Sequence, residues 1–151
     1  MDLNRMIERV KKSTDPDKVG MITSHLGVVR ATSRDGSEVT GLEVAYDHTA
    51  LQAVVRDIKQ MPGIAEVLVE TREGRLNIGD EILAVVVAGD IRENVFPALV
   101  TAVNRIKKEA SRKKDKAVKI RIKDKGDNPK VKALSVSCVF LPFSFLLCFR
   151  G

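Results

Sequence analysis

The sequence has few aromatic residues and few cysteines. It contains no tryptophan and one tyrosine, and its only two cysteines, Cys138 and Cys148, lie in the C-terminal stretch. Two cysteines are too few for a disulfide framework or a four-cysteine zinc site. The N-terminal residues also lack the apolar segment of a secretory signal. These absences favour a reducing compartment, and we expect a cytoplasmic protein.

The motifs of several common enzyme classes are also missing. No HExxH, GxSxG, Walker A or GxGxxG motif occurs, so metalloprotease, serine hydrolase and nucleotide-binding functions lack their usual support. The two histidines, His25 and His48, are far apart and have no cysteine or acidic cluster beside them at metal-ligand spacing. We therefore predict no metal site and no cofactor, and we expect an ordinary polar or partly buried role for each histidine.

The net charge of +6 comes from one part of the chain. Residues 105–132 hold 13 lysines and arginines against 4 acidic residues, whereas residues 1–104 hold 12 against 16. Such a block is typical of a solvated helix end or tail, and it is also compatible with an anion site. Nucleic-acid binding is the weaker alternative, because the block contains no aromatic residue for base stacking.

Hydrophobic spacing predicts three helices and four strands in the first 106 residues. The predicted helices span residues 2–12, residues 47–61 with Asp47 as N-cap, and residues 90–106. The predicted strands span residues 19–31, 39–46, 64–74 and 81–89, with a hairpin signal at Asp35-Gly36 and a turn across residues 75–81. We therefore predict an α+β fold, in which helices pack on a mixed, largely antiparallel sheet.

The start of the last predicted helix contains two conflicting signals. Asp90 and Glu93 resemble a capping box, which would begin the helix at Asp90. Pro97 would then lie in the helix interior, where it costs about 3 kcal/mol or kinks the axis unless the helix begins later.

The C-terminal part differs in composition from the rest of the chain. Val118, Ile120 and Ile122 alternate with charged residues and predict an edge strand over residues 118–123. The apolar stretch Leu134–Phe149 contains Pro142 and is shorter than the roughly 20 residues that cross a bilayer. This stretch is therefore expected to be a strand that packs on the body or on a second subunit, or a non-native extension of the coding sequence. A membrane anchor is the minor alternative.

Two segments, GMITSHLGVVRATSRDGSEVTGLEVAY and VETREGRLNIGDEILAVVVAGDIRENVFPALVTAVNRIKKE, together resemble the large, catalytic subunit of molybdopterin synthase. The resemblance covers roughly residues 18–116. Its most specific parts are the G-x-V-R strand end at Gly27 to Arg30 and the R-x-G-x-L-x-x-G-[DE] turn from Arg72 to Asp80. On this basis we divide the chain into an N-terminal helix and turn (residues 1–17), a synthase-like domain (residues 18–123), and a linker with an apolar tail (residues 124–151).

The resemblance implies a sulfurtransferase of molybdenum cofactor biosynthesis with an α/β hammerhead-like fold. It implies a homodimer that binds two copies of a small ubiquitin-like carrier subunit, which makes a heterotetramer. The carrier's C-terminal Gly-Gly thiocarboxylate would enter each active site and deliver sulfur to cyclic pyranopterin monophosphate. Two such transfers would form the dithiolene of molybdopterin.

Site residues follow from the resemblance position by position. Arg30 matches the family's strand-end arginine and Arg92 the arginine of its Ser-x-His-Arg segment, so both are expected to bind anions, with Lys113 as a further substrate-binding cation. Counting without gaps from Ile106 places Lys114 on the catalytic lysine, and Lys116 is the candidate for a second active-site lysine.

The sequence departs from the family pattern beside these residues. Ile91 stands where the family has histidine, and Ser111-Arg112-Lys113 replaces a Pro-apolar-Trp run. A lost imidazole removes one proton carrier. The departures favour a second interpretation, in which the chain is a synthase-like scaffold that binds the carrier without turning over substrate.

Overall fold

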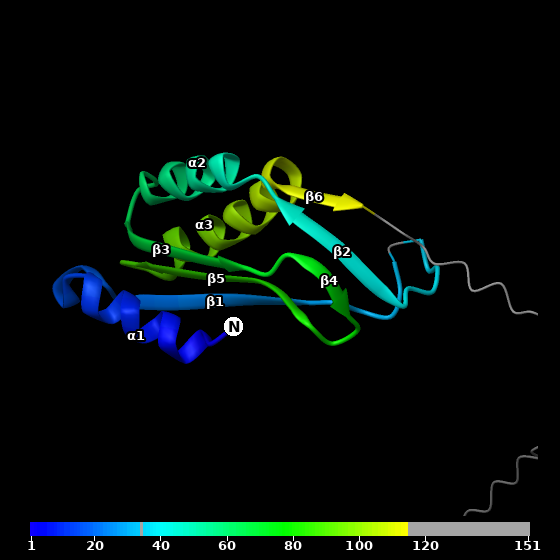
Figure 1. The fold of residues 1–151 in the computed structure, drawn as a ribbon. Helices are drawn as coiled ribbons and strands as arrows, with labels where there is room; N and C mark the ends of the chain where they lie inside the picture. The colour runs from blue at the N-terminus through cyan, green and yellow to red at the C-terminus, as the bar shows by residue number, and fades with distance from the viewer. Residues whose placement is uncertain (34, 115–151) are drawn as a thin grey trace, which may run out of the picture. The chain divides into compact units, whose positions relative to one another are not determined.

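A computed structural model describes residues 1–33 and 35–114, with the backbone alone at Lys113 and Lys114 (Figure 1). The described part contains α1 (Leu3–Ser13), η1 (Pro16–Lys18), β1 (Met21–Val28), β2 (Gly41–Tyr46), α2 (His48–Lys59), β3 (Ile64–Thr71), β4 (Gly74–Asn77), β5 (Glu81–Gly89), α3 (Arg92–Arg105), the π-helical η2 (Ile106–Ala110) and β6 (Ser111–Lys114). The predictions for Lys116, for the strand at residues 118–123 and for the tail at residues 134–149 lie outside this part.

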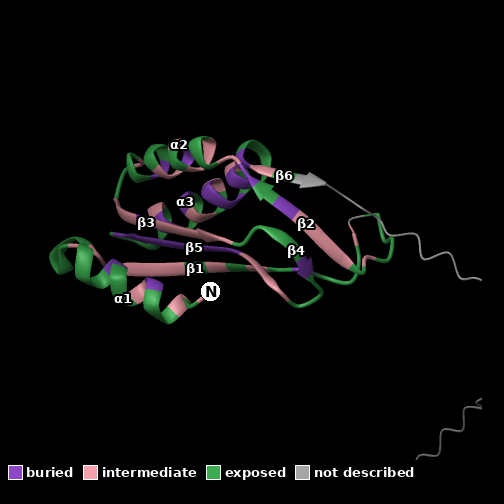
Figure 2. Ribbon diagram, viewed as in Figure 1, coloured by how far each residue is buried: buried purple, intermediate pink, exposed green. Residues whose placement is uncertain are grey.

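The larger sheet has the order β1-β5-β3, and both pairings are antiparallel. Its central strand, β5, is the continuous apolar run of the sequence, and its residues from Leu83 onward are buried (Figure 2). A strand that is covered on both faces has this continuous pattern instead of an alternating one. Helix α1 packs on one face of this sheet, and α2 and α3 lie on the other (Figure 1).

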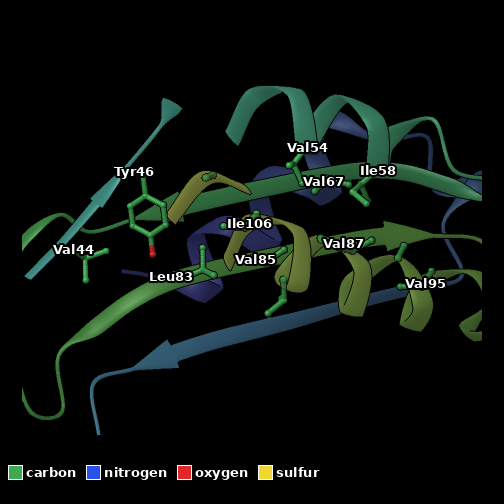
Figure 3. Close-up of a cluster of buried hydrophobic side chains, with 14 of the residues drawn as sticks. Val44, Tyr46, Val54, Ile58, Val67, Leu83, Val85, Val87, Val95 and Ile106 are labelled. Atoms are coloured by element: carbon green, nitrogen blue, oxygen red, sulfur yellow. The ribbon is translucent and has the colours of Figure 1, made fainter. Parts of the chain in front are cut away.

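Alternate residues of β5 belong to two separate hydrophobic cores. Ala84, Val86 and Ala88 pack against Met6 and Val10 of α1. The intervening residues face α2 and α3 in the larger core. Its members from these elements and from η2 include Leu83, Val85, Val87, Val54, Ile58, Val95 and Ile106 (Figure 3). The period-2 geometry of a strand therefore distributes one apolar segment between two helical layers.

The second sheet has the order β4-β2-β6, and it was only partly predicted. The predicted turn across residues 75–81 is wrong in its first half, because Gly74–Asn77 form β4 and pair with β2. Leu76 explains the pairing, since its side chain is 5% exposed and belongs to the larger core. β6 was not predicted, because its sequence SRKK has no apolar residue.

The predicted hairpin between the strands at residues 19–31 and 39–46 is present only at its tip. Thr32 and Glu38 form an isolated bridge, and Gly36 has a positive φ of 88°. The strands beyond this tip separate, since β1 pairs with β5 and β2 with β4 and β6. The antiparallel ladder between β1 and the apolar strand β5 is longer, and it forms in place of the hairpin that the local turn signal predicts. The α+β class is confirmed, with two antiparallel sheets in place of one mixed sheet.

Helix α3 begins later than the capping-box pattern predicts. Ile91 is the N-cap and makes no side-chain capping bond. The Asp90 carboxylate instead accepts hydrogen bonds from the Asn94 side chain and the Ile91 backbone N–H, which lower its pKa. Glu93 pairs with its neighbour Arg92 at 2.9 Å. The later start still leaves Pro97 inside the helix.

Replacing Pro97 with alanine is expected to stabilise the protein. Pro97 is exposed, so the substitution removes no core contact and restores an N–H that can donate to the carbonyl of Glu93. The interior penalty of about 3 kcal/mol is offset in part by the more flexible unfolded chain, so the net gain is about 1–2 kcal/mol. Urea unfolding measures the change, and an unchanged or lower midpoint would contradict it.

Three glycines lie where the chain segments around β5 meet. The Gly20 N–H donates to the carbonyl of Gly89, and the Asp90 N–H donates to the carbonyl of Gly63, each at 2.9 Å. A Cβ on Gly89 would overlap the carbonyl oxygen of Gly63 and lie 2.8 Å from Cγ2 of Val95. This junction joins the ends of all three strands of the larger sheet to the start of α3.

Candidate functional site

The predicted anion-binding residue Arg30 lies just beyond the end of β1 and is exposed. Its neighbour Val29 is buried and holds the backbone in place, because its N–H donates to the carbonyl of Asp80 at 2.9 Å and its own carbonyl accepts from Gly79 at 2.8 Å. On the other side, the carbonyl of Ala31 accepts from Val39 at 2.8 Å. Arg30 is thus fixed between the turn after β4 and the segment that leads into β2.

Lys113 and Lys114, the predicted substrate-binding and catalytic lysines, lie in β6 at the edge of the second sheet. Their backbone register pairs Lys113 with Val44 and Lys114 with Glu43 of β2. Two contacts of Asp47 hold the start of this strand. Its N–H donates to the carbonyl of Ala110 at 2.8 Å, and its carboxylate lies 3.3 Å from a guanidinium nitrogen of Arg112.

Asp47 has a second role as the predicted N-cap of α2. Its carboxylate accepts from the N–H groups of Ala50 and Thr49, each at 3.1 Å. The Ala50 N–H is the largest cause of the lowered pKa of Asp47, and Arg112 contributes further. The carboxylate therefore stays ionised well below neutral pH and joins α2 to β6.

Arg30 and Lys114 lie towards the same end of the second sheet. Val39, which is bonded to Ala31, precedes Glu43 by four residues, and Glu43 pairs with Lys114. Four residues of extended chain span about 14 Å. These two predicted residues can therefore border one elongated site.

Arg92 lies at the opposite end of the larger sheet. It follows Gly89, which pairs with Met21 at the start of β1, whereas Arg30 follows the end of β1 at Val28, which pairs with Glu81. The nine residues of β5 extend over about 27 Å. One chain therefore does not bring Arg30 and Arg92 to the same substrate.

Arg92 continues an exposed stripe along α3. Phe96 and Val100 follow it at four-residue intervals and are 51% and 58% exposed. Residues at this spacing lie on the same side of a helix. Ile91, at the position where the resemblance expects histidine, is 53% exposed beside this stripe. Large apolar side chains so exposed in a row indicate a contact surface.

The two histidines lie in different environments. Nε2 of His25 is buried and has no hydrogen-bond partner within residues 1–33 and 35–114. Burial lowers the pKa of His25, and the charge of Lys107 lowers it further, so this imidazole is neutral at pH 7. Nε2 of His48 lies 2.8 Å from a carboxylate oxygen of Glu73. No group of three or more candidate metal ligands occurs in the part of the chain that the structure describes.

An open groove of about 610 Å³ runs along α2 and β3. It is lined by His48, Leu51, Gln52, Val55, Arg56, Lys59, Gln60, Val67, Leu68 and Val69. No predicted site residue borders it. No described helix is long and apolar enough to cross a membrane.

The fold is that of proteins of molybdopterin biosynthesis. It is similar to a molybdopterin biosynthesis MoaE protein from Burkholderia ambifaria, with 22% identity over 77% of this chain and 79% of that one and a TM-score of 0.62. Molybdopterin synthase from Staphylococcus aureus matches with 20% identity, 71% and 82% coverage and a TM-score of 0.57. A complex of subunits 1 and 2 of molybdopterin-converting factor from Helicobacter pylori matches with 17% identity, 75% and 78% coverage and a TM-score of 0.51.

The family model described as MoaE protein matches residues 1–109. The chain therefore belongs to the MoaE family, the catalytic subunits of molybdopterin synthase, and the predicted family is confirmed. No curated protein matches the chain. The match ends before β6, so it contains Arg30 and Arg92 but neither Lys113 nor Lys114.

Proposed function

We propose that this chain transfers sulfur from the thiocarboxylated tail of a small carrier subunit to cyclic pyranopterin monophosphate. The observation that carries the proposal is the MoaE match over residues 1–109. The Helicobacter pylori structure of similar fold, a complex of subunits 1 and 2 of its converting factor, supports a small protein partner for this chain too. We place this sulfur transfer in the cytoplasm. We assign it to the domain of residues 18–123.

The chemistry requires cations beside two acidic reactants. The substrate brings a phosphate, and the carrier brings a thiocarboxylate that becomes a carboxylate when its sulfur leaves. Arg30 suits the phosphate, since a guanidinium binds two oxygens at once, and Lys113 adds positive charge. Lys114 performs the chemical step as acid, base or nucleophile, with Lys116 as the second lysine.

We further propose that Arg92 serves the site of the partner subunit in a homodimer. Within one chain about 27 Å of β5 separate it from Arg30. The stripe of Arg92, Phe96 and Val100 provides an apolar surface that a second copy would bury. In a two-fold dimer the same surface contacts itself, so each subunit would present its Arg92 to the other.

Mixing two inactive variants tests this arrangement. If Arg92 acts across the interface, Arg92→Ala and Lys114→Ala subunits form heterodimers with one intact site of two. Random reassortment makes half of the dimers mixed, so about a quarter of wild-type activity returns. If Arg92 acts within its own chain, the mixture stays as inactive as its components. Light scattering before and after mixing confirms that the variants are dimers.

The proposed function itself is tested with a thiocarboxylated carrier and cyclic pyranopterin monophosphate, scored by formation of molybdopterin. Product establishes the synthase. The exposed Ile91, which cannot carry a proton, favours the scaffold as the second candidate. Binding of the carrier without product, at saturating thiocarboxylate, would identify the scaffold and reject the enzyme. An Ile91→His variant that then gained activity would identify the missing group.

A further inference from the structure

β3 is an outer strand of the larger sheet, and no strand in the part of the chain that the structure describes pairs with its other edge (Figure 1). Arg72 follows β3 directly, and its N–H donates to the carbonyl of Ile82 at 2.9 Å, on the side of β5. Successive residues of an antiparallel strand turn their N–H and C=O groups alternately towards the partner and away from it. Thr71, Val69 and Val67, which share one uninterrupted register with β5, therefore turn theirs outward. The free edge of β3 is a row of backbone donors and acceptors for a further strand.

The open groove along α2 and β3 includes part of this free edge. Val67 and Val69 line it together with apolar side chains of α2. Arg56 and Lys59 of α2 also line it, and none of its lining residues is an aspartate or a glutamate. The groove thus combines an apolar surface with a local excess of positive charge. These two properties fit an extended segment in which apolar and acidic side chains alternate.

Glu66 shows which chemical group this edge accepts. Its carboxylate accepts a hydrogen bond from the outward Val67 N–H at 2.9 Å. The same carboxylate lies 2.7 Å from Nζ of Lys59, and the Glu66 side chain is only 15% exposed. A carboxylate of the chain itself thus occupies one end of the free edge, paired with a cation of the groove. An acidic partner can reproduce both contacts.

We propose that the free edge of β3 and the adjoining groove bind an extended acidic segment of a partner protein, which adds a strand to the larger sheet. Backbone hydrogen bonds to the three outward residues of β3 provide affinity, and Arg56 and Lys59 select acidic side chains. The segment replaces Glu66 at the Val67 N–H. No predicted site residue borders the groove, so this inference does not depend on the proposed function.

A synthetic peptide of about ten residues, in which valine and glutamate alternate, is the probe for this surface. Fluorescence anisotropy measures its binding to the full chain, and a peptide with lysine in place of glutamate is the matched probe of opposite charge. We expect the acidic peptide to bind about tenfold more tightly than the basic one, because the charged residues of the groove are all basic. Equal affinities, or no binding of the acidic peptide, would overturn the inference.

Thr71→Pro tests whether the segment pairs with the backbone. Proline removes an N–H that faces away from β5, so the ladder of the larger sheet stays intact. This variant should bind the acidic peptide about tenfold more weakly. Thr71→Val keeps the N–H at the same position and should bind as the wild type does. With both variants folded by circular dichroism, equal binding by the two would contradict backbone pairing and the inference with it.

Arg56→Glu tests the selection of acidic side chains. It should weaken binding of the acidic peptide about fivefold. Arg5→Glu makes the same charge change at an exposed position of α1 and should leave binding unchanged. Glu66→Ala should strengthen binding several-fold, because it removes the internal competitor, whereas Glu70→Ala, which removes a strand glutamate that pairs with α1 instead, should not. Equal binding by Arg56→Glu and Arg5→Glu would argue against the groove as the binding site.

A second copy of the chain is the competing occupant of this edge. Light scattering with and without the acidic peptide distinguishes the two, because a dimer paired through β3 would dissociate as the peptide binds. An unchanged state of association, with the peptide bound, supports a separate partner protein. Dissociation on binding would replace the inference with a dimer formed through β3.

Discussion

Lys114→Ala is expected to lower the rate of molybdopterin formation by at least 100-fold, with little change in carrier binding. The lysine is assigned the chemical step, and positioned acid–base groups contribute about 10²–10⁴-fold to a rate. Because β6 is an edge strand held by backbone pairing with β2, the substitution leaves the ladder intact. Single-turnover assays with a saturating thiocarboxylated carrier measure the rate of the chemical step.

Lys108→Ala is the matched control for this prediction. Lys108 is an exposed lysine of η2, six residues earlier and in the same basic part of the chain. If local positive charge were sufficient for activity, Lys114→Ala and Lys108→Ala would lower the rate of molybdopterin formation by similar factors. Equal rates in Lys114→Ala and wild type would refute the assignment of the lysine. A selective loss in Lys114→Ala, with an unchanged circular dichroism spectrum, would support it.

Gly89→Ala is expected to lower the free energy of unfolding by about 3 kcal/mol, the largest stability effect among these variants. The added methyl group would overlap the Gly63 carbonyl oxygen, which is held by its hydrogen bond from Asp90. It would also lie 2.8 Å from Cγ2 of Val95, which is fully buried. A backbone oxygen cannot move aside as a flexible side chain can, so the ends of β3 and β5 must separate.

Gly27→Ala provides the control for Gly89→Ala. Gly27 is also a strand glycine, but a Cβ there has its nearest neighbour, Nε2 of His25, at 3.5 Å, which is ordinary contact. The substitution should change stability by less than about 1 kcal/mol. Chemical unfolding followed by circular dichroism compares the two variants. Similar losses in the free energy of unfolding would contradict the prediction that crowding around Gly89 destabilises the Gly89→Ala variant.

Much of the fold followed from hydrophobic periodicity. α1, α2 and β5 lie close to where spacing predicted them, because each is long and its burial follows the period of its own backbone. β4 and β6 could not be predicted in this way. Each has four residues, and their pairing depends on β2, which lies far away in the sequence.

The candidate site depended far more on the resemblance than on pattern. Nothing in the sequence pattern distinguishes Arg30 and Arg92 from other surface arginines. Only the antiparallel register reveals that they lie at opposite ends of β1 and β5. The place of Lys114 in β6 follows from a strand whose sequence is polar throughout, so no periodic signal pointed to it.

The order of strands in the larger sheet affects how the chain can fold during synthesis. β1 ends at Val28, but its partner β5 begins at Glu81. At about 5–20 residues per second, β1 waits several seconds on the ribosome before β5 exists. β2 likewise waits for β4 and β6. Such distant pairings give a high contact order and slow folding, so β1 on a nascent chain has no strand to pair with in the larger sheet until β5 emerges.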